Sequence, residues 1–206
     1  MGYITLKKEA AAELEDRKSI FIARAKPVTD EKEALAFLAS VKAEDRTATH
    51  NVFAYRLRER NFSRYSDDGE PSGTAGLPVL DVLERPGITD AIIVVTRWFG
   101  GTLLGTGGLV RAYSGAARLA VEAAGTVTME MAGRYRLRCS YGDYDRVMRA
   151  ASDCGVTVEG SDFTDTVLIT YTAMDGPAAA FSAAVRELTR GNSSPELAEK
   201  GFLSVG

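Results

Sequence analysis

The first two-thirds of the chain alternates between the apolar period of strands and that of helices. Apolar residues occupy every second position from Phe21 to Ala25, and from Ala34 to Val41 they recur at helical spacing. The run 91–95 is apolar on both faces, which is typical of a strand covered on both sides. The predicted elements are strands at 3–8 and 19–28, a helix capped by Thr29 or Asp30, a strand at 50–57, a polar loop at 66–76, a short helix at 77–85, the strand at 91–95, and a helix from 109 to a glycine cap at 125.

A second pattern begins near 126–133. Residues 134–141 alternate with period two, and helical stripes follow around Tyr144 and after Asp175. Further strands are predicted at 155–163, 165–174 and 200–206. The order β-α-β-β-α-β is that of the ferredoxin-like fold. The sequence therefore predicts an α+β protein of two domains, residues 1–130 and 131–206.

Composition and charge narrow the class of protein. The hydrophobic fraction of 45% is ordinary for a soluble protein, and no apolar run approaches the ~20 residues of a membrane helix. The N-terminus lacks the apolar core of a signal peptide, and Cys139 and Cys154 lack metal-site spacing. We therefore expect a cytoplasmic protein without membrane contact. The net charge is −3, and neither predicted domain has the basic excess of a typical nucleic-acid-binding protein.

A glycine-rich turn, "TRWFGGTLLGTGGLVR", joins the apolar strand to an alanine-rich helix. Strand, glycines and helix in this order can cradle nucleotide phosphates. A P-loop, however, needs lysine where Thr106 stands, and a dinucleotide-binding turn needs a glycine where Val110 stands. The sequence therefore disfavours a nucleotide site.

Arg97, Trp98 and Phe99 directly follow the apolar strand. An unpaired guanidinium in such a place would be costly, so we expect Arg97 either to pair with a carboxylate of the 67–70 loop or to face a cleft. Trp98 and Phe99 can stack on bases or anchor a protein partner. They can equally fill the space between the sheet and its helices, and the sequence leaves both alternatives open.

Other candidates for chemistry are weaker. The loop "SDDGEP" lacks the alternating ligands of a calcium loop, so a solvated turn is favoured and no metal site is predicted. His50 is the only histidine, and no G-x-S-x-G elbow accompanies it. A structural, hydrogen-bonded role for His50 is therefore favoured. The sequence predicts no catalytic residue and no cofactor.

Two groups of arginines could meet an anionic partner. The run "YRLRERNFSR" contains the first group, and a solvated strand edge or hairpin explains it equally well. Arg134, Arg136 and Arg138 share one strand face and form the second group. On an open sheet they would contact an RNA backbone with little sequence preference. The same face could instead be buried against the first domain.

Four motifs occur in one order along the chain: "KSIFIA", "ATHNVFAY", "SDDGEPSGTAGLPVL" and "VVTRWFGGTLLGTGGLVRAY". Together they resemble the bacterial YigZ branch of the IMPACT family, over the whole chain. The resemblance implies a first domain like domain IV of elongation factor G, with a left-handed βαβ crossover, and a second domain like domain V of that factor. It also implies a link to translation, because eukaryotic members restrain a translation-control kinase by competing for its activator. RNA or ribosome binding by bacterial members is an inference from fold, which does not fix function.

Three functional hypotheses follow. The protein is a non-catalytic, translation-linked module that contacts RNA, the ribosome or a translation factor; or a regulator that binds a protein without nucleic acid; or an enzyme acting on a small phosphorylated ligand or nucleotide. The candidate contact residues are Arg56, Arg58, Arg64, Arg97, Trp98, Phe99, Gly100, Gly101, Arg111, Arg134, Arg136 and Arg138. The candidate ligand-loop residues are Asp67, Asp68, Glu70, Ser72 and Thr74.

Overall fold

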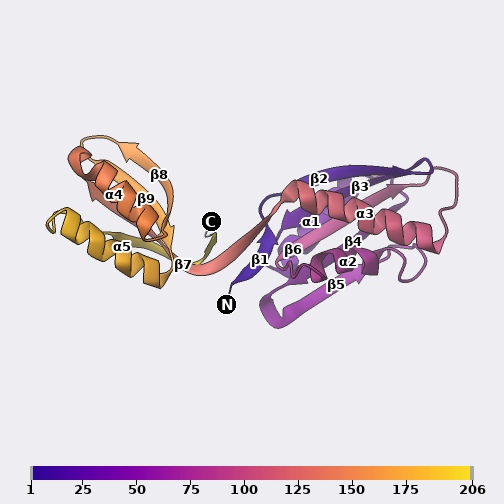
Figure 1. Ribbon diagram of the computed structural model, residues 1–206. Helices are drawn as coiled ribbons and strands as arrows, with labels where there is room; N and C mark the ends of the chain where they lie inside the picture. The colour runs from indigo at the N-terminus through magenta and orange to yellow at the C-terminus, as the bar shows by residue number, and fades with distance from the viewer. Residues whose placement is uncertain (1, 205–206) are drawn as a thin grey trace. The chain divides into compact units, whose positions relative to one another are not determined.

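The computed structural model describes residues 2–204 and divides them into two compact units (Figure 1). The N-terminal unit comprises residues 3–127, and the C-terminal unit comprises Gly2 and residues 128–204. No helix within residues 2–204 combines the length and the apolar character needed to cross a bilayer.

The N-terminal unit is built on a five-stranded antiparallel sheet. Its elements are β1 (Tyr3–Leu6), β2 (Ala10–Asp16), β3 (Ser19–Pro27), α1 (Glu31–Glu44), β4 (His50–Leu57), the 3₁₀ turn η1 (Glu59–Asn61), β5 (Phe62–Ser66), α2 (Gly76–Glu84), β6 (Ala91–Trp98) and α3 (Thr106–Ala124). The strand order is β2-β3-β6-β4-β5, and each neighbouring pair is antiparallel. Strands β3 and β4 therefore run parallel to each other on either side of β6, with α1 between them in the chain.

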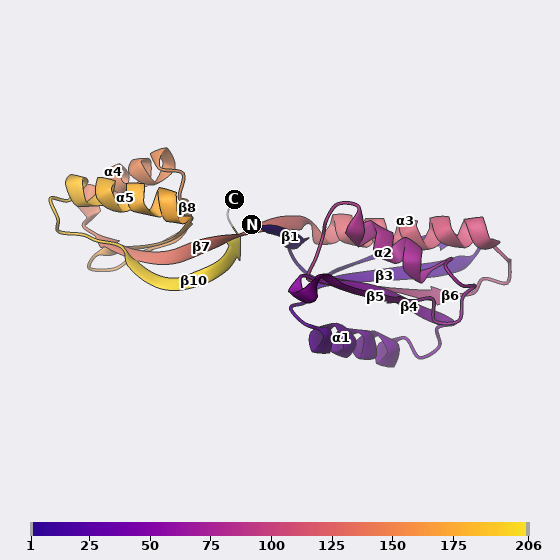
Figure 2. The same ribbon diagram turned by 90° about the horizontal axis from the view of Figure 1, so that it is seen from below.

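Helices cover both faces of this sheet, α1 on one face and α2 with α3 on the other (Figure 2). The alternation along β6 explains the arrangement. Ile92 and Val94 pack in the cluster that contains α1, whereas Ile93 and Val95 pack in the cluster that contains α2 and α3. The uninterrupted apolar run of β6 thus corresponds to a strand buried on both sides, as predicted.

The C-terminal unit has the predicted ferredoxin-like order. Its elements are β7 (Thr126–Cys139), α4 (Tyr141–Asp153), β8 (Thr157–Phe163), β9 (Val167–Ala173), α5 (Asp175–Leu188) and β10 (Glu196–Ser204). The strands pair antiparallel in the order β10-β7-β9-β8. Both helices pack on one face of the sheet, over the buried side chains of Leu137, Ile169 and Tyr171. The mixed α+β, two-domain architecture is therefore confirmed.

Some element boundaries differ from the predicted ones. Strand β2 was not predicted, β5 corresponds to the hairpin alternative for the first arginine group, and β7 and β10 begin earlier than expected, at Thr126 and Glu196. Asp30 rather than Thr29 caps α1, because its side chain accepts the hydrogen bond from the backbone of Glu33. The last two residues of the predicted final strand, 205–206, lie outside the described residues.

Candidate functional site

Arg97 lies at the end of β6 and points into the N-terminal unit. It is 5% exposed, and its Nη1 donates to Glu70 Oε1 at 2.6 Å. Its Nη2 donates to Ser19 Oγ at 3.3 Å, and the guanidinium carbon lies 5.4 Å from the centre of the Phe21 ring. The expectation that a carboxylate of the 67–70 loop compensates Arg97 therefore holds, and the partner is Glu70.

Glu70 joins Arg97 to two further elements. Its side chain is 4% exposed, and Oε1 also accepts a hydrogen bond of 2.7 Å from the hydroxyl of Tyr113 on α3. His50 Nε2, at the start of β4, lies 3.7 Å from the same oxygen. Burial, followed by the Glu70 carboxylate, raises the pKa of Tyr113 well above its usual value. The cluster therefore ties the loop before α2 to β3, β4, β6 and α3.

The two aspartates of the loop bind backbone groups. Asp67 accepts hydrogen bonds of 2.8–3.0 Å from the N–H groups of Gly73, Ala75 and Gly76, where α2 begins. Asp68 accepts a bond of 2.7 Å from the N–H of Asn51. Such bonds satisfy donors that would otherwise be unpaired at a helix start and a strand end.

The remaining polar residues of this loop also have defined surroundings. Lys42 donates to Asp68 at 3.2 Å, and His50 Nδ1 lies 2.8 Å from the Asp68 carbonyl oxygen. Thr74 is buried and donates to the carbonyl of Pro71 at 2.6 Å, whereas Ser72 is exposed. Of the five candidate ligand-loop residues, four are thus engaged within the protein.

Steric fit and backbone conformation explain why glycines occupy the turn after β6. A Cβ on Gly100 would lie 2.0 Å from the carbonyl carbon of Lys18, so this strand end fits only a glycine. Gly101 and Gly105 have φ angles of 83° and 74°, a region that favours glycine. The turn is therefore specified by backbone geometry.

The two aromatic residues of the turn have different environments. Trp98 Nε1 donates to Thr47 Oγ1 at 3.2 Å, and the ring is partly buried. Phe99 is 46% exposed, with its ring centre 5.6 Å from the Arg97 guanidinium carbon. Leu103, farther along the turn, is 81% exposed. The end of the turn, rather than Arg97, faces solvent.

The arginines of the β4–β5 hairpin also make contacts within the N-terminal unit. Arg58 pairs with Asp90 at 3.3 Å, and Arg64 pairs with Glu31 at 3.4 Å. Arg56 donates to the carbonyl of Ile88 at 3.4 Å. Their charges are in part compensated by the protein itself.

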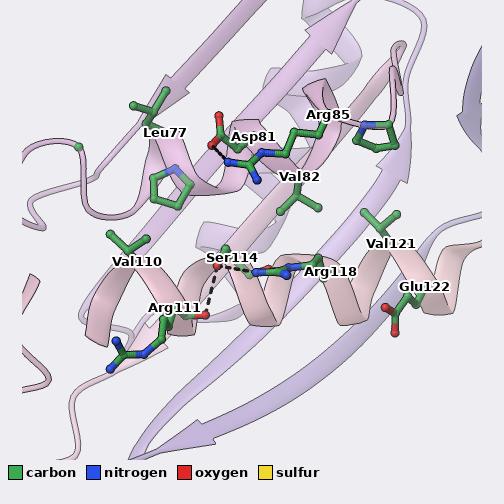
Figure 3. Close-up of a pocket in the computed structure, with 13 residues that line it drawn as sticks. Leu77, Asp81, Val82, Arg85, Val110, Arg111, Ser114, Arg118, Val121 and Glu122 are labelled. Carbon is green, nitrogen blue, oxygen red and sulfur yellow. Dashed lines mark hydrogen bonds and ion pairs between the residues drawn. The ribbon is translucent and has the colours of Figure 1, made fainter. Parts of the chain in front are cut away.

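A groove between α2 and α3 forms a recess in the N-terminal unit (Figure 3). Its volume is about 680 Å³, and Leu77, Val82, Val110 and Val121 form much of its lining. Leu77 and Val110 are 42% and 38% exposed, although both are large apolar residues on helices. Figure 3 shows that Leu77 comes from α2 and Val110 from α3, the two helices that line the recess.

Arginines border the same groove. Arg111 lies at one end on α3, and it is the only sequence-predicted site residue that lines the groove. Arg118 lies one to two turns farther along and donates to Ser114, while Arg85 of α2 pairs with Asp81 at 3.2 Å. Sequence reasoning missed the apolar lining. The sequence does indicate this lining, because α2 carries apolar residues on more than one face, including Leu77 and Val82.

In the C-terminal unit, the three arginines of β7 lie on the sheet face opposite the helices. Arg134 pairs with Glu159 at 3.0 Å and with Glu199 at 2.8 Å, and these carboxylates raise its pKa. Arg136 and Arg138 are exposed. Within this unit, the face that carries them is open to solvent.

These features define a two-domain α+β protein with an internally paired polar motif in its first unit, and comparison with known proteins identifies its family. A model of the Impact N-terminal domain matches residues 17–121, and a domain of unknown function, DUF1949, matches residues 137–192. The chain belongs to the IMPACT family.

Full-length relatives support this assignment. The chain is 32% identical over 203 residues to the IMPACT family member YvyE of Bacillus subtilis, covering 98% of this chain and 94% of that protein. It is 35% identical over 181 residues to the IMPACT family member YigZ of Escherichia coli, covering 86% and 89%. Protein IMPACT of Bos taurus matches over 94 residues at 36% identity, which is 44% of this chain and 30% of that protein.

A solved structure shares the architecture. A crystal structure of a hypothetical protein, 31% identical in sequence, superimposes with a TM-score of 0.61 over 96% of this chain and 98% of its own. The similarity therefore extends over both units.

Proposed function

We propose that this protein is a non-catalytic, translation-linked regulator that binds a protein partner in the groove between α2 and α3. The observation that carries the proposal is the groove itself, an apolar recess of about 680 Å³ with two large aliphatic side chains exposed at its mouth. A contiguous apolar recess with a polar rim is typical of a protein-binding surface. The link to translation rests on the family resemblance.

The groove has an apolar lining and three arginines against the two carboxylates of Asp81 and Glu122, which favours an amphipathic helix with acidic flanks as the occupant. Such a helix would lay its apolar face on Leu77, Val82 and Val110 in the manner of helix-in-groove recognition. Its carboxylates would meet Arg111 and Arg118, which have no carboxylate partner within residues 2–204. Charge complementarity at the rim would set orientation and association rate.

The internal pairing of the motif residues supports a non-catalytic role. Arg97, Glu70 and Asp67, which the enzyme hypothesis needs as free groups, are hydrogen-bonded to one another or to backbone. A catalytic group must reach a substrate. These side chains instead stabilise the turn and the start of α2.

RNA binding by the open face of the C-terminal sheet has weaker support than partner binding in the groove. Strand register places Asp162 and Glu196 on the same open face as Arg138 and Arg136, and Glu159 and Glu199 contact Arg134. This face thus carries four carboxylates and three guanidinium groups, so it has no excess of positive charge. RNA-binding sheets also present aromatic residues for stacking, and β7 presents arginines there.

Affinity capture with matched variants tests the proposal. Tagged protein is incubated with nuclease-treated native lysate, and captured proteins are quantified for the wild type, Val110→Asp and Leu77→Asp. We expect both variants to lose at least about tenfold of a stoichiometric partner, because a buried carboxylate opposes apolar docking. Leu119→Asp, at an exposed position of α3 outside the groove, should capture normally.

Two results would oppose the proposal. One is a partner retained equally by all three variants, and the other is a partner lost on nuclease treatment. A synthetic peptide tests binding in the groove without requiring that the natural partner be known. A synthetic amphipathic helix with leucines at i, i+3, i+4 and i+7 and flanking glutamates should bind the wild type and the Leu119→Asp variant, but not the Val110→Asp variant.

A further inference from the structure

A second, smaller cavity lies in the C-terminal unit, on the open sheet face that carries the arginines of β7. Its volume is about 280 Å³. Arg136 and Arg138 of β7 and Leu168 of β9 form one side of it, and the loop before β10 forms the other. The residues from that loop and the start of β10 are Asn192, Ser193, Ser194 and Glu196.

The two arginines differ from their neighbour on the same strand face. Arg134 is saturated by Glu159 and Glu199, as described above. Neither Arg136 nor Arg138 forms an ion pair within residues 2–204. Side chains two positions apart on a strand project from the same face, so both guanidinium groups are available to one ligand.

The opposite side of the cavity consists of small polar groups on a fixed turn. After α5, Arg190 and Gly191 have φ angles of 53° and 83°, and the N–H of Asn192 bonds to the carbonyl of Thr189 at 3.0 Å. The N–H of Ser193 bonds to Thr189 Oγ1 at 3.2 Å. The backbone and the hydroxyl of Thr189 thus fix the turn. Its three polar side chains line the cavity without a hydrogen-bond partner within residues 2–204.

We propose that this cavity binds the phosphate group of a small phosphomonoester. Two guanidinium forks match the charge of a phosphate dianion and can bind its oxygens in bidentate fashion. The amide of Asn192 and the hydroxyls of Ser193 and Ser194 supply further donors. Glu196, the one carboxylate of the lining, accepts a hydrogen bond from a hydroxyl of the ligand.

The surroundings favour a small ligand over a nucleic-acid strand. The arginine pair ends at Arg134, whose charge two glutamates compensate, and Asp162 lies in the same row as Arg138. A strand of phosphates extending from the cavity along the sheet would meet these carboxylates. One phosphate group with a few attached atoms fits this recess of about 280 Å³.

Titration of the full chain with inorganic phosphate and with glycerol 3-phosphate tests this site, by amide NMR shifts and calorimetry at fixed ionic strength. We expect saturable shifts at 136–138, 168 and 192–194. Arg136→Gln and Arg138→Gln should each weaken binding about tenfold or more, since each removes charge-assisted hydrogen bonds. Arg149→Gln, an equal charge change at an exposed position of α4, should leave the affinity unchanged.

Further variants and a competing RNA distinguish bidentate phosphate recognition from non-specific binding and from RNA binding. Arg136→Lys keeps the charge and loses the fork, so weaker binding in a variant with an unchanged melting temperature supports bidentate recognition. Equal weakening by Arg149→Gln, or shifts spread over the surface, would overturn the site. Tighter binding of a single-stranded RNA, competing at the same arginines, would overturn the assignment to a small phosphomonoester. This inference concerns the C-terminal unit and does not depend on the groove of the N-terminal unit.

Discussion

Arg97 places a guanidinium at the end of an apolar strand, 2.6 Å from the carboxylate of Glu70. The sequence could predict that Arg97 needs a carboxylate, because an uncompensated charge there is costly. It could narrow the partner to three residues of one loop, but not choose among them. Choosing requires the tertiary contact that brings residues 70 and 113 together. The same holds for the two aromatic residues, since only packing separates the partly buried Trp98 from the exposed Phe99.

The ion pair gives a stability prediction. Arg97→Met or Glu70→Gln should lower the free energy of unfolding by about 3–5 kcal/mol, because each leaves a buried charge without its counter-charge. The double variant Arg97→Met/Glu70→Leu should recover part of that loss. Trp98 is the only tryptophan, so its fluorescence in a urea titration follows the N-terminal unit. Single-variant losses below about 1 kcal/mol would contradict the structural role of the pair.

The glycine turn gives a matched pair of substitutions. Gly100→Ala should destabilise the N-terminal unit severely, because the added Cβ would lie 2.0 Å from the backbone of Lys18. Gly107→Ala should be neutral or stabilising by about 0.5–1 kcal/mol, since Gly107 is helical and has no close contact at that position. The same tryptophan-detected unfolding measures both. Equal effects of the two substitutions would show that steric fit does not specify the turn.

At the scale of elements, strands and helices with a clear apolar period could be predicted, and those with a misleading composition could not. Strand β6 was predicted from its uninterrupted apolar run, and the β-α-β-β-α-β order of the C-terminal unit from its alternating periods. Strand β2 was missed because "AAAELED" consists mainly of helix-forming residues, and pairing with β3 overrides that propensity. The groove was missed because it requires α2 to lie beside α3.

The ion pair between Arg134 of β7 and Glu159 of β8 predicts that the stability of the C-terminal unit depends on pH. A hydrogen bond from Thr172, together with Arg134, lowers the pKa of Glu159. A carboxyl group with a lowered pKa in the folded state stabilises the fold above its unfolded pKa, and this contribution is lost as the pH falls through the folded pKa. Glu159→Gln should therefore reduce the acid sensitivity of the C-terminal unit, followed by tyrosine near-UV dichroism between neutral and acidic pH. Acid sensitivity equal to that of the wild type would contradict this role.

At the scale of the whole molecule, the chain belongs to the IMPACT family and consists of two compact units with separate cores. Its conspicuous charged motif is internal to the first unit, whereas its open recesses combine motif residues such as Val110 with residues that no motif marks, such as Arg118 and Ser193. Motif matching from sequence therefore located the residues that specify the fold. The recesses depend on which side chains remain uncovered after packing, and that is a property of the tertiary structure.

The enzyme alternative makes a prediction for the whole chain. ATP, GTP or NAD at millimolar concentration with Mg²⁺ should leave the melting temperature of the N-terminal unit unchanged within about a degree. The glycine turn has Thr106 where a P-loop has lysine, and the loop carboxylates bind backbone and Arg97. Ligands that bind at micromolar affinity would raise the melting temperature by several degrees at that concentration. Such a rise would favour a nucleotide enzyme.

The most direct test of the central claim is amide hydrogen exchange on the complex with the acidic amphipathic peptide or with the captured partner. We expect slower exchange concentrated in 77–85 and 110–122, the two helical segments that line the groove. We expect no change on helix α1, which covers the opposite face of the sheet. Protection confined to the turn at 98–103 or to the C-terminal unit, with the groove unchanged, would contradict the claim.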